Sequence, residues 1–141
     1  MSGVLSDPFH LFAIYAAVNA LIMLALGVLV VRARVKTKVG IGDGGLPELG
    51  RPLRAHANNT EYTPMALILM LGLSSLGSPV WILHAVGLPL TLGRVLHGIA
   101  LSRNEGPSTM RLVGMVLTFL AYIVGIVALL WLAIVPLAVA S

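Results

Sequence analysis

The sequence is poor in three residue classes: it has no cysteine, few charged residues and few aromatic residues. The absence of cysteine excludes disulfide bonds, thiolate metal ligands and a cysteine nucleophile, and it does not indicate a compartment. Only 10% of the 141 residues are charged, whereas soluble domains carry roughly 25%. Because 58% of the residues are hydrophobic, the composition indicates an integral membrane protein.

Three long stretches contain no charged residue: 9–31, 62–93 and 112–141. A membrane-spanning helix needs about 20 apolar residues, so the middle stretch is too long for one helix. It divides at Ser78 and Pro79, where a serine N-cap and a proline at the first helical position start a new helix. The sequence therefore predicts an all-α bundle of four membrane-spanning helices. These lie near residues 8–31, 53–76, 79–102 and 109–138.

The basic residues lie between the predicted spans and therefore predict the orientation of the chain. Six of the nine lysines and arginines lie between Arg32 and Arg54, and Arg103 and Arg111 flank the third connection. The positive-inside rule places both connections in the cytoplasm and both termini on the other side, near which the two tryptophans would lie. The net charge of +4 thus reflects topology and not a nucleic-acid partner. The N-terminus lacks the features of a cleaved secretory signal, so we expect the first span to remain in the mature protein.

Two familiar site types do not fit this sequence. Residues 40–50 are rich in glycine, but they lack the Gly-Lys-Ser/Thr ending of a phosphate-binding loop and follow no predicted strand. We expect a tight connector with positive φ at several glycines. The histidines lack the spacing of His-Glu-x-x-His or a comparable motif, so we expect no metal site.

Ionisable residues gather at the entrance of the second span and within the third. On a helix Arg54, Asn58 and Glu61 share one face, and Arg51 falls one turn earlier on it. A charge at the bilayer centre costs about 3 kcal/mol on insertion scales, so such groups should face protein or water. Arg94 on the third span is the obvious partner for Glu61. This ion pair could simply hold two helices together.

The functional alternative makes the same region a binding pocket. Its arginines outnumber its one glutamate, and such an excess of positive charge favours an anionic ligand. Four residues would join Arg94 and Glu61 around this pocket, namely Arg51, Arg54, Asn58 and His97.

The chain resembles the MAPEG family, the membrane-associated proteins in eicosanoid and glutathione metabolism. The resemblance covers the four spans, the basic first connection and the Gly42-Asp43-Gly44-Gly45 connector of bacterial members. Its most specific part is the motif Arg51-x-x-Arg54-Ala-His56-x-Asn58-x-x-Glu61-Tyr62-x-Pro64. Length and motif order look most like small bacterial inner-membrane members. The resemblance implies one four-helix domain over residues 1–141, a homotrimer and a location in the inner membrane.

The resemblance also implies that glutathione binds between adjacent subunits, near the cytoplasmic ends of the helices. By this match Arg54 pairs with a glutathione carboxylate, Asn58 bonds the tripeptide backbone and Glu61 receives its amino group. Glutathione carries one ammonium and two carboxylates, which suits several arginines and a single glutamate. The other residues implied in binding it are Arg51, Tyr62, Arg94 and His97.

Arg111 corresponds to the family arginine thought to stabilise the thiolate of glutathione. A nearby cation lowers the pKa of a thiol. The alternative role for Arg111 is a positive-inside anchor that extends to the membrane interface. The chain also departs from the family pattern, because tyrosine positions of the family fall at His97, Leu101 and near Met115. Part of the glutathione site is therefore missing or rebuilt, with His97 as a possible donor.

These observations support two functional hypotheses. The leading one is a trimeric membrane enzyme that activates glutathione or a related thiol, and adds it to a lipophilic electrophile or reduces a lipid hydroperoxide. The lipophilic co-substrate would enter from the surrounding lipid along the first and fourth spans of neighbouring subunits. The alternative is a non-catalytic scaffold or lipid-binding trimer that retains the motif for helix packing. A small transporter is disfavoured because the chain has no inverted repeat.

Overall fold

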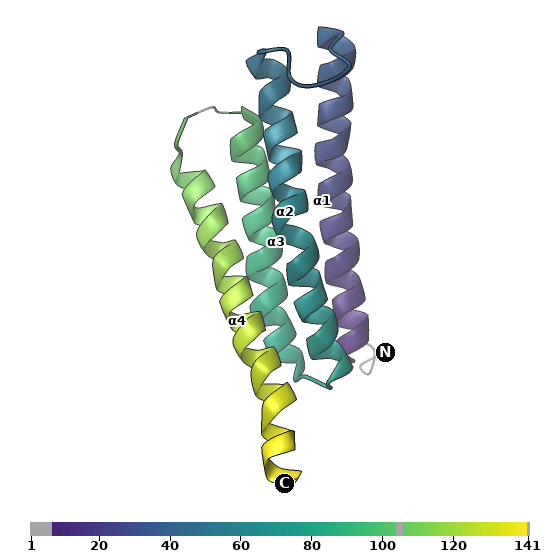
Figure 1. The fold of residues 1–141 in the computed structure, drawn as a ribbon, viewed down its shortest axis with the longest axis vertical. Helices are drawn as coiled ribbons and strands as arrows, with labels where there is room; N and C mark the ends of the chain where they lie inside the picture. Colours follow the sequence, from purple (N-terminus) through teal and green to yellow (C-terminus); the bar gives the residue numbers. More distant parts are fainter. Residues whose placement is uncertain (1–6, 104–105, 141) are drawn as a thin grey trace.

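The computed structural model describes residues 7–103 and 106–140, with side chains to residue 135, and folds them into four helices. Figure 1 shows these helices side by side in a bundle. No strand occurs among the described residues, which confirms the predicted all-α class. The helices are α1 (Pro8–Thr37), α2 (Pro47–Ser75), α3 (Val80–Arg103) and α4 (Thr109–Ala140).

The first two helices extend beyond their predicted spans toward the first connection. At its start, α1 is capped by Asp7, whose carboxylate accepts the backbone N–H of Phe9 at 3.0 Å. The hydrogen bond from His10, and then that from Phe9, lower the pKa of Asp7. At the other end α1 continues to Thr37. Because Pro47 is pre-organised for the first turn, α2 begins six residues before the predicted start at residue 53.

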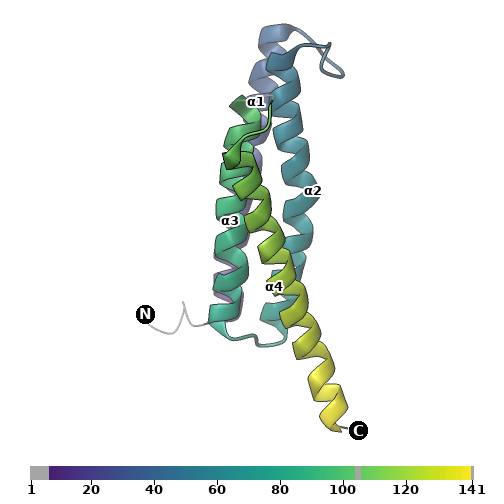
Figure 2. The same ribbon diagram turned by 90° about the vertical axis from the view of Figure 1, so that its left-hand side faces the viewer.

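Three helices are long and apolar enough to cross a membrane among the described residues: α1, α3 and residues 109–135 of α4. The surface of the bundle is correspondingly aliphatic, with many large apolar side chains exposed. The chain is therefore an integral membrane protein. The polar residues in the first half of α2 leave this helix outside the set of three, although it runs alongside the others (Figures 1 and 2). That α2 also spans the membrane stays a prediction.

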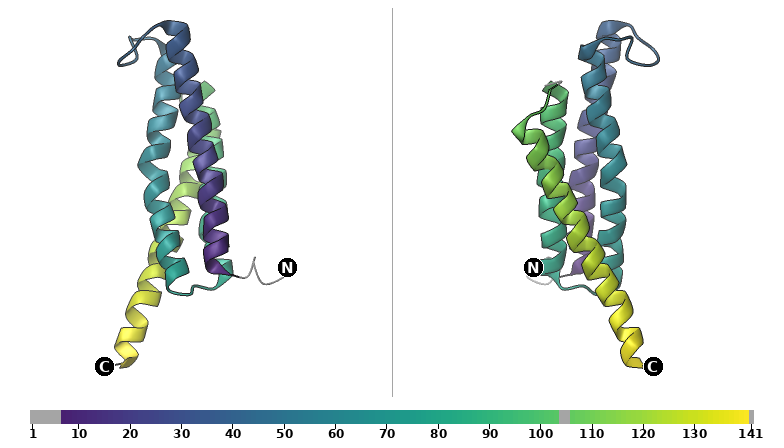
Figure 3. Two further views of the ribbon diagram at one scale, coloured as in Figure 1. Left: turned by 90° about the vertical axis from the view of Figure 1, so that its right-hand side faces the viewer. Right: turned by 60° about the vertical axis from the view of Figure 1, so that its left-hand side comes forward.

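The first connection, the end of α3 and the start of α4 lie at one end of the bundle (Figure 1). The starts of α1 and α3 and the last part of α4 lie at the other end (Figures 1 and 3). Trp81, near the start of α3, and Trp131, late in α4, are 68% and 66% exposed. This arrangement agrees with the pattern of basic and aromatic residues in the sequence, and which end faces the cytoplasm stays a prediction.

The first connection is a tight turn, as its glycines predicted. Gly42, Gly44 and Gly45 have positive φ angles of 68°, 62° and 68°, which side chains rarely tolerate. Arg34 fixes the loop from α1, because its Nη1 donates to the carbonyl oxygens of residues 39, 40 and 42, each at 3.1 Å. These three hydrogen bonds therefore fix the conformation of the first connection.

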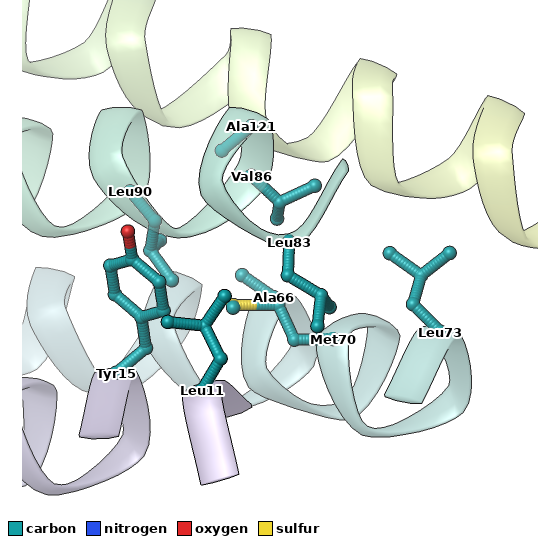
Figure 4. Packing of buried hydrophobic residues seen from close by; sticks show 9 residues of the cluster. All are labelled: Leu11, Tyr15, Ala66, Met70, Leu73, Leu83, Val86, Leu90 and Ala121. Carbon is teal, nitrogen blue, oxygen red and sulfur yellow. The ribbon is translucent and has the colours of Figure 1, made fainter. Parts of the chain in front are cut away.

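The half of the bundle nearer the termini is held by an aliphatic core that draws on all four helices (Figure 4). Its side chains are fully or almost fully buried. The residues are Leu11, Tyr15, Ala66, Met70, Leu73, Leu83, Val86, Leu90 and Ala121. Within this core, the hydroxyl group of Tyr15 is hydrogen bonded to Nδ1 of His84 at 2.8 Å. The opposite half of the bundle contains the polar residues of the predicted site.

The helices α3 and α4 cross very closely at two glycines. A Cβ atom on Gly93 would lie 2.7 Å from the carbonyl oxygen of Gly114, and one on Gly114 would lie 2.8 Å from that of Gly93. Small residues allow helix backbones to approach in this way inside a membrane. The crossing therefore requires glycine on both helices.

We expect Gly93→Ala to destabilise the protein by about 1–3 kcal/mol, because the added methyl group forces the two backbones apart. Thermal unfolding of the detergent-solubilised protein, followed by circular dichroism, measures this change. The control is Gly125→Ala, whose new methyl group would meet its nearest atom, on Leu69, at an ordinary 3.4 Å. Equal stability of the two variants would contradict the close crossing.

Candidate functional site

The polar centre of the bundle is the buried guanidinium of Arg94, which is only 1% exposed. Its Nε and Nη2 both donate to Oγ1 of Thr118 on α4, at 3.1 and 2.6 Å. Its Nη1 donates to Oδ1 of Asn58 on α2 at 3.0 Å. The ring of Tyr62 lies 5.5 Å from the guanidinium carbon, within cation–π range. Arg94 therefore joins α2, α3 and α4.

The predicted ion pair between Arg94 and Glu61 is wrong. In the part of the chain that the structure describes, the ion pairs join Asp7 to His10 and Lys36 to Glu48. Helix geometry explains the difference. With 3.6 residues per turn, the residues three and four positions after Asn58 flank it and are about 100° apart around the helix axis. Tyr62, four positions on, faces Arg94, whereas Glu61 is exposed.

Neutral dipoles hold the charge of Arg94 in place of a carboxylate. The hydroxyl of Thr118 donates to the carbonyl oxygen of Gly114 at 2.8 Å, so its oxygen lone pairs are available to the guanidinium. The sulfur of Met115 lies 3.4 Å from Nη2 and is a further neutral partner of the guanidinium. A buried charge without such partners would be strongly destabilising.

The contact with Arg94 also fixes the orientation of the Asn58 side chain. A guanidinium has only donors, so the amide oxygen of Asn58 must face it. The amide nitrogen of Asn58, with its two N–H donors, must then point away from Arg94. Since Asn58 is half-buried, part of the residue is accessible at the outer surface of the bundle.

Arg54 and Glu61 lie on the outer side of α2. Both are exposed, and within the described residues neither makes a hydrogen bond or an ion pair. Glu61 stands midway along α2, among helices whose outer surfaces are aliphatic. An exposed carboxylate is costly in such surroundings. This face of α2 therefore presents a cation and an anion that have no polar partner within the described residues.

Five of the eight predicted site residues border three different hollows near the basic end of the bundle. Arg51 and Arg94 border a cleft of about 560 Å³ between α1, α2 and α3. Arg51 and Arg54 border a second hollow of about 280 Å³, together with the buried Leu101. His97 and Arg111 border the third, of about 360 Å³. The other three, Asn58, Glu61 and Tyr62, border none of these hollows. A single chain does not gather all predicted site residues into one cavity.

His97 and Arg111 come together where α3 meets the start of α4. The Nδ1 of the buried His97 lies 3.2 Å from the carbonyl oxygen of Arg111, to which it donates. This bond leaves Nε2 of His97 as an acceptor. The Arg111 side chain is half-buried and reaches the carbonyl oxygen of Gly106 at 3.5 Å. These two predicted residues therefore lie together where α3 and α4 meet, and their part in a binding site stays a prediction.

Sequence reasoning missed Thr118, the residue that accepts two of the hydrogen bonds of Arg94. A lone threonine in the apolar run of α4 has no charge to draw attention. Its only signal was its position four residues after Gly114, which allows its hydroxyl to bond back to the helix backbone.

We expect Thr118→Val to cost about 2–3 kcal/mol of stability, because the buried guanidinium loses the acceptor of two of its N–H groups while the side-chain shape is kept. Denaturation in mixed detergent micelles, followed by tryptophan fluorescence, measures the loss. Thr118→Ser keeps the oxygen and should retain most of the stability. If valine and serine behave alike, Thr118 does not support Arg94.

Comparison with known proteins agrees with this architecture. The model of the MAPEG family matches residues 12–131. Inner membrane protein YecN of Escherichia coli strain K12 is 40% identical over 85 residues, which are 60% of this chain and 65% of the relative. The protein of the same name from Escherichia coli O6:H1 gives the same values. The matched part is thus less than two thirds of these relatives' own length, and no solved structure matches. The chain belongs to the MAPEG family.

Proposed function

We propose that this protein is a membrane enzyme that binds glutathione, or a related thiol, on the outer face of α2 and delivers it to a lipophilic electrophile or hydroperoxide. The observation that carries the proposal is the pair of exposed charges, Arg54 and Glu61, on either side of Asn58. These residues supply a cation for a carboxylate, amide donors for a peptide carbonyl and an anion for an ammonium group.

The spacing of these groups suits an extended tripeptide. On a helix Arg54 and Glu61 are separated by about 10 Å along the axis. An extended chain of three residues spans about 10 Å. A carboxylate of the peptide would thus reach Arg54 while its amino group reaches Glu61. Asn58, held by Arg94, would meet the backbone between them.

The site is completed between subunits in this proposal. Arg54 and Glu61 point out of the bundle, and charges exposed to hydrocarbon are costly. A closed homotrimer, as in the family, covers such a face on every subunit without leaving an unpaired surface. The partners are therefore two further copies of the chain, membrane lipids, the thiol and a lipophilic molecule. We place the protein in a bacterial inner membrane, with both connections in the cytoplasm.

Arg111 is the residue to which we assign the catalytic role. Its charge near the bound thiol would favour the thiolate, while the released proton passes to water. The thiolate sulfur would then add to an electrophilic carbon while the π bond at that carbon breaks, and the resulting anion takes a proton from water. With a hydroperoxide, two glutathione molecules would be oxidised to the disulfide while the hydroperoxide is reduced to an alcohol and water.

We expect Arg54→Ala and Glu61→Gln each to weaken glutathione binding at least tenfold, because each removes the partner of a charged group on the ligand. Calorimetric titration of the detergent-purified trimer with glutathione measures the affinity. Arg32→Ala is the control, since Arg32 is an exposed arginine at the same end of the bundle.

Unchanged affinity in both site variants would show that α2 does not hold the thiol. Loss of assembly in these variants, with no thiol-dependent turnover by the wild type, would instead support the scaffold role.

We expect Arg111→Gln to raise the pKa of bound glutathione. A free thiol has a pKa of about 8.5, and a shift of two units corresponds to about 2.7 kcal/mol. A cation lowers that pKa by favouring the thiolate, so its loss moves the titration to higher pH and decreases the thiolate at neutral pH. Ultraviolet absorbance of the thiolate across a pH series measures this. Arg103→Gln, on the other side of the same connection, is the control, and an unchanged titration in Arg111→Gln would leave Arg111 as a membrane anchor.

A further inference from the structure

The largest of the three hollows is a groove between α1 and α3 with a volume of about 560 Å³. The side chains on its α1 wall are all aliphatic, and Val95 and Ile99 continue this surface on α3. Several of these side chains are partly exposed, so the groove opens to the surface of the bundle. The residues on its α1 wall are Ile22, Ala25, Leu26, Leu29 and Ala33.

The groove has the length of one leaflet of a membrane. From Ile22 to Ala33 its wall follows α1 for about 16 Å. The hydrocarbon core of a bilayer is about 30 Å thick, so one leaflet contributes about 15 Å. The floor is close-packed, because a Cβ atom on Gly98 would lie 3.3 Å from the side chain of Leu26. The groove therefore fits a single acyl chain lying along the helices.

One end of the groove is basic. Arg51 and Arg103 border it, and Glu48 is the acidic residue among its lining residues. The carboxylate of Glu48 is already bound by Nζ of Lys36 at 2.8 Å. The arginines that line the groove outnumber its one acidic lining residue, and Arg103 lies at the end of α3, near the connections of the bundle.

We propose that this groove binds an anionic phospholipid of the surrounding bilayer. One acyl chain lies against the aliphatic walls of α1 and α3, and the phosphate is held by Arg103. Basic pockets between membrane-spanning helices bind acidic headgroups in this way, and the fork of arginine suits phosphate oxygens. The groove lies within one subunit and is lined by α1, α3 and the first turns of α2, whereas the thiol site proposed above lies further along α2, from Arg54 to Glu61. The lipid site does not depend on that function.

The positive charge of the lining arginines predicts which class of phospholipid binds more tightly. A zwitterionic phospholipid offers the same acyl chain but no net charge, so the groove should prefer phosphatidylglycerol over phosphatidylcholine. Each basic residue near an acidic headgroup contributes about 1 kcal/mol, which corresponds to a factor of about five in affinity.

Native mass spectrometry of the purified protein, after addition of phosphatidylglycerol or phosphatidylcholine, tests the proposal. We expect the wild type to retain phosphatidylglycerol at higher collision energy and in larger amount. Ala25→Trp fills the groove and should decrease the bound lipid at least tenfold. Leu24→Trp is the matched control, because Leu24 directly precedes Ala25 on α1, is 64% exposed and does not line the groove.

A second pair of variants tests the headgroup contact without changing the groove. Arg103→Gln should weaken phosphatidylglycerol binding about fivefold and leave phosphatidylcholine binding unchanged. Arg32→Gln removes an exposed arginine outside the groove and should have a smaller effect. The proposal is overturned if the two lipids bind equally to the wild type, or if each variant matches its control.

Discussion

The site in this protein depends on one buried cation. Arg94 carries a positive charge into the bundle, and its neutral partners come from the two helices on either side, α2 and α4. The hydrogen bonds to Thr118 form only because α3 and α4 approach closely at Gly93 and Gly114. The glycine crossing and the arginine therefore support each other: the crossing brings the acceptor within reach, and the hydrogen bonds hold the crossing together.

This arrangement gives α2 two different faces. Asn58 and Tyr62 turn toward Arg94, while Arg54 and Glu61 turn outward. The inner contact fixes the amide of Asn58, with its oxygen toward Arg94. A helix that is anchored in this way can present polar groups at a defined spacing, which a freely rotating side chain cannot do. The outer face thereby presents its polar groups at a fixed spacing.

Our proposals place two different ligand sites at the basic end of the bundle. The outer face of α2 pairs a cation with an anion and suits a small zwitterionic peptide. The groove between α1 and α3 combines aliphatic walls with a basic mouth and suits an amphiphile. Both begin at the end of the bundle near which most of the lysines and arginines lie.

The sequence by itself determined the helical class, the division of the chain into four helices and the grouping of basic residues at one end. It did so because uncharged runs, Pro79 and the connector glycines act locally. Only the tertiary structure decided the partners of Arg94. Helix periodicity shows which residues share a face, but it does not show which neighbour that face meets. The choice of Thr118 and Asn58 over Glu61 followed from the rotation of α2 and the close crossing of α3 and α4.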